Sequence, residues 1–194
     1  MDTITTRLAL AIVSLALVLA APAGAQEDVV REGYFEVRSA GTTLTDGVHR
    51  LDARLQLILS SEALEALESG VPLRIELQTQ LVRQKRFVPD STDAELIVDF
   101  ELEYRPLSQR YVVRSVNSGE QETFATLYSA LNHLGRVEQL PLVDDSLLAA
   151  GKPYRVRLRA LLQTQQYPAP LRLLFFWRSQ WQLKSEWYEW SLER

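Results

Sequence analysis

The chain carries few residue types that commonly perform chemistry in enzymes. It has two histidines, His49 and His133, and no cysteine, which excludes thiol catalysis and thiolate metal sites. A histidine-based site needs a second catalytic group or ligand at a defined spacing, and neither histidine has one nearby in the sequence. His133 falls in the last turn of an expected helix, where a cation suits the helix dipole. We therefore interpret both histidines as structural or solvated.

The familiar catalytic and nucleotide-binding motifs are absent from the sequence. It contains no GxSxG elbow, no HExxH zinc motif, no P-loop and no GxGxxG turn. We predict no catalytic residue, no metal site and no cofactor. A hydrolase without a recognisable motif is kept as an alternative.

Adjacent carboxylates at Asp144 and Asp145 could bind a hard cation. Such sites usually need further oxygen ligands at set positions, and no EF-hand spacing surrounds this pair. The preferred interpretation is an N-cap for one short helical turn at residues 146–149.

Two charged stripes are the remaining candidates for a binding site. Glu95, Asp99, Glu101 and Glu103 form an acidic stripe at alternate positions, and a basic stripe follows later. If their strands are neighbours, the stripes form cross-strand pairs; if not, the basic stripe could dock an acidic partner or lipid headgroups. Solvated faces are favoured, but a ligand or partner site is assigned to Arg155, Arg157, Arg159, Trp181 and Trp187.

The elements that would position these residues are mostly strands. Apolar and polar residues alternate with period 2 in five segments, which is typical of half-buried antiparallel strands: 51–59, 73–81, 94–104, 110–114 and 154–163. In this register Val98, Phe100, Val156 and Leu158 face the core, and Glu101 and Arg157 face solvent. A first strand is expected at 34–39, and Asp46-Gly47 is a hairpin signal.

Helical spacing appears in two places. Residues 61–69 end at Gly70, and residues 121–134 end at Gly135, with a possible capping box between Ser118 and Gln121. Together these patterns predict a mainly β fold, an antiparallel β-sandwich of about seven strands with two short helices. The alternative is an α+β sheet with the 121–134 helix packed across one face.

All four tryptophans lie in the last 28 residues, 167–194. We expect this tail to close the fold, because buried aromatic side chains contribute strongly to stability. A last strand is expected at 185–192, with Tyr188, Trp190 and Leu192 on its inner face. Trp187 would then lie on the other face, under the apolar segment 171–177.

The N-terminus predicts export. Residues 8–20 are apolar apart from Ser14, and the small residues Ala23 and Ala25 precede a cleavage site before Gln26. Residues 1–25 are therefore expected to be a signal peptide, 26–33 a flexible lead-in, and 34–194 one domain in the periplasm. An uncleaved anchor is the alternative. The expected mature chain keeps the net charge of −4, since the signal holds one acid and one base, so no nucleic acid is expected as a partner.

The tail also carries a family resemblance. Pro168-x-Pro170-Leu171-Arg172 and the later Ser179-x-Trp181-x-Leu183-x-Ser185-x-Trp187-Tyr188-x-Trp190 resemble the C-terminal pattern of an uncharacterised proteobacterial family, domain of unknown function 4390. Gly70-Val71-Pro72-Leu73 and Gly151-Lys152-Pro153-Tyr154 are similar to it as well. The resemblance implies exported single-domain proteins of Gram-negative bacteria, whose genes often lie near a sensor kinase. It implies no catalytic residue.

These observations favour a periplasmic binding or interaction module, with an envelope protein such as the sensor kinase as its partner. A carrier of an apolar ligand or lipid is an alternative, and it would need a cavity between the sheets of roughly 300–1,000 Å³. Membrane contact is expected only through an uncleaved signal. The oligomeric state and the ligand stay open.

We predict that an exporting host cleaves the chain between Ala25 and Gln26. N-terminal sequencing of the exported protein should begin at Gln26. A membrane-bound protein that begins at Met1 would establish the anchor instead.

Overall fold

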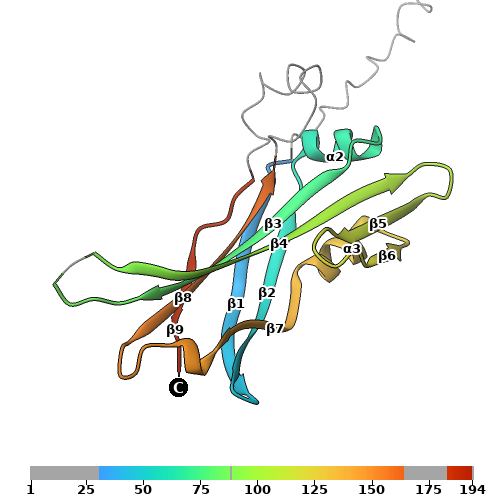
Figure 1. Cartoon of the computed structure of the whole chain (residues 1–194). Coiled ribbons are helices and arrows are strands. Elements are labelled where there is room, and N and C mark those ends of the chain that lie inside the picture. Colours follow the sequence, from blue (N-terminus) through green and yellow to red (C-terminus); the bar gives the residue numbers. More distant parts are fainter. Residues whose placement is uncertain (1–30, 88, 164–182, 194) are drawn as a thin grey trace, which may run out of the picture. The chain divides into compact units, whose positions relative to one another are not determined.

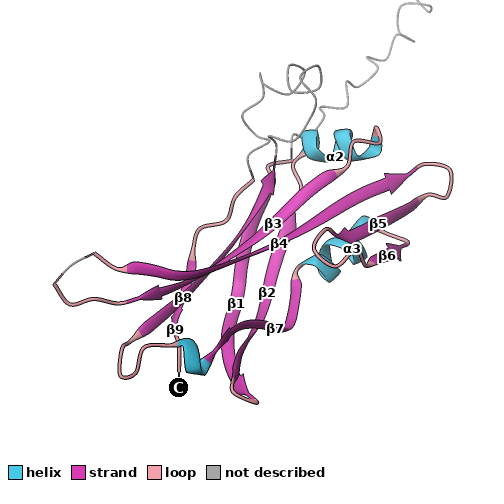
Figure 2. Cartoon of the chain, viewed as in Figure 1, coloured by secondary structure: helices cyan, strands magenta, loops and turns pink. Residues whose placement is uncertain are grey.

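The computed structural model describes residues 31–87, 89–163 and 183–193, and nearly all of the regular structure is antiparallel strand (Figure 1, Figure 2). A small sheet has the order β1 (Tyr34–Thr45), β2 (Val48–Ile58), β7 (Arg136–Asp144). A large sheet has the order β6 (Gln121–Phe124), β5 (Arg110–Ser115), β4 (Ser91–Arg105), β3 (Leu73–Arg83), β8 (Tyr154–Gln163), β9 (Tyr188–Ser191). The expected mainly β fold, with two sheets and two helices, is confirmed.

The small sheet begins with the predicted hairpin. Asp46 and Gly47 have φ angles of 51° and 77°, and this pair of positive values is what a tight two-residue β-turn requires. From this turn β2 runs antiparallel to β1. Its alternation holds as expected, since Leu51, Ala53 and Leu55 are buried in the core.

In the large sheet, β3 lies between β4 and β8 and supplies the centre of the core. Val156 and Leu158 are fully buried, as predicted, while Arg157 lies half-exposed on the opposite face. On β4 the predicted register also holds, with Val98 and Phe100 packed against the core. These two side chains are only partly buried, because they line a pocket described below.

The tail joins the two sheets along one side. β9 pairs antiparallel with β8, which places Trp190 opposite Val156, and β1 contacts both strands. The Trp190 indole Nε1 donates to Thr42 Oγ1 on β1 at 3.3 Å. Trp190 packs against both hydrophobic clusters, as expected of an inner-face residue. The expected cover over Trp187, residues 171–177, lies outside the described residues.

The first helix follows the prediction. α2 (Ser61–Glu68) is capped by the Ser60 hydroxyl, which accepts from the Ala63 N–H, and Gly70 follows with φ 85°. Before it, Arg31 accepts a hydrogen bond from the Ser61 N–H at 3.1 Å. The expected signal peptide, and the part of the lead-in before residue 31, lie outside the described residues.

The second helix is shorter than predicted. α3 (Leu127–Leu134) begins after Thr126, whose hydroxyl accepts from the Ser129 N–H, so the expected capping box at Ser118 is wrong. Residues 121–124 form β6 instead and pair with β5. Gly119, at φ 77°, turns the chain between them, and hairpin pairing therefore prevails over helical spacing in this stretch. The end at Gly135 is as predicted.

β7 was not predicted, because its sequence does not alternate cleanly. Gln139 adopts φ 50° and Pro141 cannot donate a ladder hydrogen bond, so the pairing with β2 shifts register twice. With β6 and β7 the described residues form nine strands, where about seven were expected. The short turn after β7 is as expected: η1 (Asp145–Leu147) is capped by Asp144.

Trp190→Ala should lower the free energy of unfolding by about 3 kcal/mol, because the indole links β9 to both clusters and to Thr42. Trp190→Phe, which keeps a ring but loses the Nε1 donor, should lose less. Urea unfolding monitored by circular dichroism measures both. Parent-like unfolding of the alanine variant would show that the tail does not hold the sheets together.

Candidate functional site

The outer face of the large sheet carries the charged stripes, and they are not neighbours. β3 separates β4 from β8, and its glutamines connect the two stripes. Arg157 Nε donates to Gln80 Oε1 at 2.7 Å, and Gln80 Nε2 donates to Glu95 Oε1 at 2.6 Å. The amide of Gln80 thus accepts from the basic stripe and donates to the acidic one. This hydrogen-bond chain supports the interpretation of the stripes as a solvated, structural face.

A second row repeats this arrangement around a buried carboxylate. Arg159 Nε donates to Gln78 Oε1 at 2.6 Å, and the side-chain amides of Gln78 and Gln163 both donate to Glu76. Glu76 is only 6% exposed, and the two amide donors compensate for its burial.

The same face holds a close ion pair between β3 and β4. Arg74 Nη2 lies 2.7 Å from Asp99 Oδ2, and this hydrogen bond raises the pKa of Arg74. The acidic stripe is therefore tied to β3 at two points, Gln80 and Arg74.

Four of the five residues assigned to a binding site lie on β8 and just before β9. The guanidinium carbons of Arg157 and Arg159 lie 4.6 and 4.2 Å from the centroid of the Trp187 ring, within cation–π range. Arg155 pairs with Glu189 at 2.7 Å. The fifth residue, Trp181, lies outside the described residues. Stacking that joins the loop before β9 to β8 is a structural role, so this cluster is not our preferred site.

The histidines lie in separate surroundings, each beside its own carboxylate. His49 is fully buried, with Nε2 at 2.9 Å from Asp145 Oδ1, where a substrate could not reach it. His133 Nε2 lies 3.5 Å from Glu122 Oε1 and its ring packs against Phe124. Among the described residues they do not converge on one cleft.

Asp144 acts as a cap rather than as a metal ligand. Its carboxylate accepts from the Ser146 hydroxyl at 2.6 Å and from the Ser146 N–H at 2.8 Å, and these bonds lower the pKa of Asp144. Across residues 31–87, 89–163 and 183–193, no group of three potential metal ligands gathers. No helix in that part of the chain is long and apolar enough to cross a bilayer.

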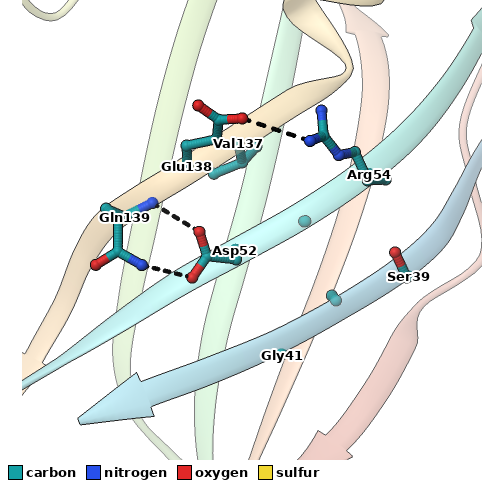
Figure 3. Close-up of a pocket in the computed structure, with 9 residues that line it drawn as sticks. Ser39, Gly41, Asp52, Arg54, Val137, Glu138 and Gln139 are labelled. Atoms are coloured by element: carbon teal, nitrogen blue, oxygen red, sulfur yellow. Dashed lines mark hydrogen bonds and ion pairs between the residues drawn. The ribbon is translucent and has the colours of Figure 1, made fainter. Parts of the chain in front are cut away.

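Two pockets remain. The first, of about 360 Å³, is a depression on the small sheet at the irregular β2–β7 pairing (Figure 3). There Asp52 accepts from the backbone and side chain of Gln139 at 3.0 and 2.8 Å, and Arg54 faces Glu138 at 3.4 Å (Figure 3). These bonds explain the positive φ of Gln139, since Asp52 holds the bulge. The polar side chains of this pocket bond to one another and hold β2 and β7 together.

The second pocket, of about 480 Å³, is more apolar and lies between the sheets on the side away from the β1–β9 contact. We call it the β4–β7 pocket. It is lined by β4, by β5 and the turn to β6, by His133 of α3, and by Leu140 of β7. Its apolar lining residues are Leu96, Ile97, Val98, Phe100, Val113 and Leu140.

The rim of the β4–β7 pocket is acidic. Glu120 and Glu122 belong to its lining, and the lining contains no lysine or arginine. Figure 1 shows α3 next to β5 and β6, and the pocket lining includes His133 of α3 and Glu122 of β6. An apolar group that carries positive charge at its periphery would fit the pocket best.

Sequence patterns alone did not identify this pocket. The alternation of Leu96, Val98 and Phe100 indicated an inner face correctly, but the opposite wall comes from β7 and the β5–β6 turn, which were not predicted. Residues of β4, β5, β6, α3 and β7 meet there, and only the strand order brings them together.

Comparison with known proteins gives one match. The model of a family described as Domain of unknown function (DUF4390) matches residues 33–191. No curated protein and no solved structure matches the chain.

Trp187→Ala should lower the free energy of unfolding by about 1–3 kcal/mol, because two stacked guanidinium groups lose their ring. Leu107→Ala, at a fully exposed turn position, should change it by less than about 0.5 kcal/mol. Urea unfolding decides between the roles. If the Trp187→Ala protein is as stable as the Leu107→Ala control, the structural role is wrong and Trp187 is again a candidate for partner binding.

Proposed function

The chain belongs to the DUF4390 family, and we propose that it is an exported, periplasmic binding module whose site is the β4–β7 pocket. The proposal rests on one observation: the sheets contact each other through β1, β8 and β9 on one side, while an apolar pocket lies on the other. The apolar N-terminal segment and its small-residue cleavage site support export.

The size and chemistry of the pocket support binding. About 480 Å³ falls within the range of roughly 300–1,000 Å³ that is usual for ligand sites. Apolar walls supply affinity through burial, and the carboxylates at the rim select against anions. The cavity expected for a carrier is thus present, so an apolar ligand or lipid is the second candidate.

An enzymatic function is supported by fewer observations than a binding function. His133 is the one histidine at the pocket, and its neighbour is Glu122 at 3.5 Å. Ser115 and Ser118 also line the pocket, but the Ser118 hydroxyl donates to Glu120 at 3.2 Å, and within the described residues neither serine is hydrogen-bonded to His133. A protein of the envelope, including the sensor kinase that the family resemblance implies, is therefore proposed as partner rather than a substrate.

Filling the pocket tests the proposal. In Val98→Trp the indole would occupy the β4–β7 pocket. The control variant, Leu107→Trp, adds the same group at an exposed turn. Both variants should fold, because neither enlarges a side chain within the fully buried core. Each is exported, cross-linked in the envelope and purified, and bound proteins and lipids are identified by mass spectrometry.

We expect a protein captured by the parent and by Leu107→Trp to be reduced at least tenfold with Val98→Trp. Equal capture by all three proteins would contradict the pocket as a site. Loss of a bound lipid alone, with unchanged protein capture, would favour the carrier function over the interaction module.

A further inference from the structure

β4 has an edge that its neighbour covers only in part. β4 runs over Ser91–Arg105, but β5 pairs with it only from Phe100 to Arg105. Among the described residues, the stretch 91–98 pairs with β3 alone. One side of this half of β4 is therefore the edge of a sheet, and an edge exposes backbone donors and acceptors.

The backbone direction identifies which groups are exposed. The Asp99 C=O accepts from the Val116 N–H at 2.8 Å, so the backbone N–H and C=O of Asp99 are directed away from β3. The backbone N–H and C=O groups of successive residues alternate between the two edges of an antiparallel strand. The backbone groups of Glu95 and Ile97 are therefore directed to the same edge as those of Asp99. The intervening Leu96 points to β3, where it pairs with Thr79.

Asn117 imitates a strand residue at the point where β5 ends. Its Oδ1 accepts from the Asp99 N–H at 2.8 Å, and its Nδ2 donates to the Ile97 C=O at 3.4 Å. Beyond it, the structure gives no partner from the described residues to the N–H of Ile97 or to the backbone groups of Glu95. The side chain of Asn117 thus extends the β4–β5 hydrogen-bond ladder as far as the Ile97 C=O.

The edges on the two sides of the pocket differ in protection. β7 carries Pro141 and the irregular Gln139, both of which hinder the addition of a strand. The stretch of β4 over 95–98 contains neither proline nor a bulge, and the first register shift is upstream, at the Leu81–Val82 step of β3. Ile97, 39% exposed, adds an apolar side chain on the outer face.

This edge borders the β4–β7 pocket. Leu96 and Val98 line it from the inner face of β4, next to the groups that lack a backbone partner. A strand laid along β4 would direct every second side chain into the pocket. The intervening side chains would lie on the opposite face, beside the exposed carboxylate of Glu95.

We propose that the β4 edge at Glu95–Ile97 accepts an extended peptide segment of a partner protein, with alternating apolar and basic residues, as an added antiparallel strand. This deepens the proposed binding function and rests on the pocket being its site. Backbone hydrogen bonds would give the segment its direction, the pocket would select apolar side chains at alternate positions, and the exposed carboxylate of Glu95 on the opposite face of β4 would attract the basic ones.

The probe is a capped eight-residue peptide of alternating leucine and lysine, titrated into the exported parent protein. Binding is followed by calorimetry and by amide NMR shifts of Glu95, Ile97 and Asp99. We expect saturable shifts at these amides. An alternating leucine–glutamate peptide should bind at least tenfold more weakly, because its carboxylates would lie beside the carboxylate of Glu95.

Backbone methylation separates strand addition from simple apolar contact. Two further peptides carry N-methyl groups, one at the leucines and one at the lysines. An added strand turns only one of these sets toward β4, so one methylated peptide should lose at least tenfold in affinity while the other keeps most of it. Equal binding by the parent peptide and both methylated peptides would overturn strand addition.

A matched pair of variants tests the edge itself. Ile97→Pro removes the outward N–H without touching the ladder to β3, whereas Ile97→Thr keeps it. We expect peptide affinity to fall at least tenfold in the proline variant and to change little in the threonine variant. If Ile97→Pro does not fold, the methylated peptides on the parent protein decide.

The outcomes separate this inference from the broader one. Peptide binding that is lost in Val98→Trp but insensitive to Ile97→Pro and to methylation would leave the pocket as a site and overturn the strand. Binding that is insensitive to Val98→Trp as well would overturn both. Self-association of the parent through the same amides, seen by sedimentation, would identify a second copy as the occupant and overturn the partner segment.

Discussion

The contact between the tail and the first hairpin governs how the two sheets are placed. Trp190 on β9 packs against both hydrophobic clusters and donates to Thr42 on β1. Because this contact joins β1 to the β8–β9 side, the opposite strands, β7 and β4, are free to diverge around a pocket. A mainly β domain without cysteine thus obtains both a core and a cavity from the same strand order.

The outer face of the large sheet shows how a charged surface can be structural. Glutamines on β3 stand between the acidic and the basic stripe, where each amide can accept from an arginine and donate to a carboxylate. The buried Glu76 and the paired Arg74 complete the network. Arg157 and Arg159 keep Trp187 in place over β8, so the most basic strand of the protein owes its composition to packing.

Period-2 alternation was sufficient to predict the strands that have one buried face. β2, β3 and β8 bury the residues expected, because each is covered on one side only and the pattern records that asymmetry. The pattern was insufficient where local chemistry intervenes. In β7, Gln139 and Pro141 break the alternation, and in β6 four residues are too few to outweigh the helical spacing of Phe124 with Leu127 and Leu131.

The site was harder to predict than the fold for the same reason. The assigned arginines and Trp187 lie together beside the last strand, which the sequence did not indicate, and neighbours on β3 make them part of a structural network. The pocket depends on where β5 stops pairing with β4, and that point is set by the turn at Asn117 and Gly119. Strand ends are decided by long-range pairing, which a single sequence does not record.

Hydrogen exchange at single amides tests the unpaired β4 edge most directly. Along β4 the amides of Ala94, Leu96 and Val98 face β3, while those of Glu95 and Ile97 face outward. NMR-detected exchange of the exported protein should therefore show alternation, with the first three amides protected and the other two exchanging at least a hundredfold faster. Uniform protection over residues 94–98 would show that another strand already covers this edge and would contradict the account.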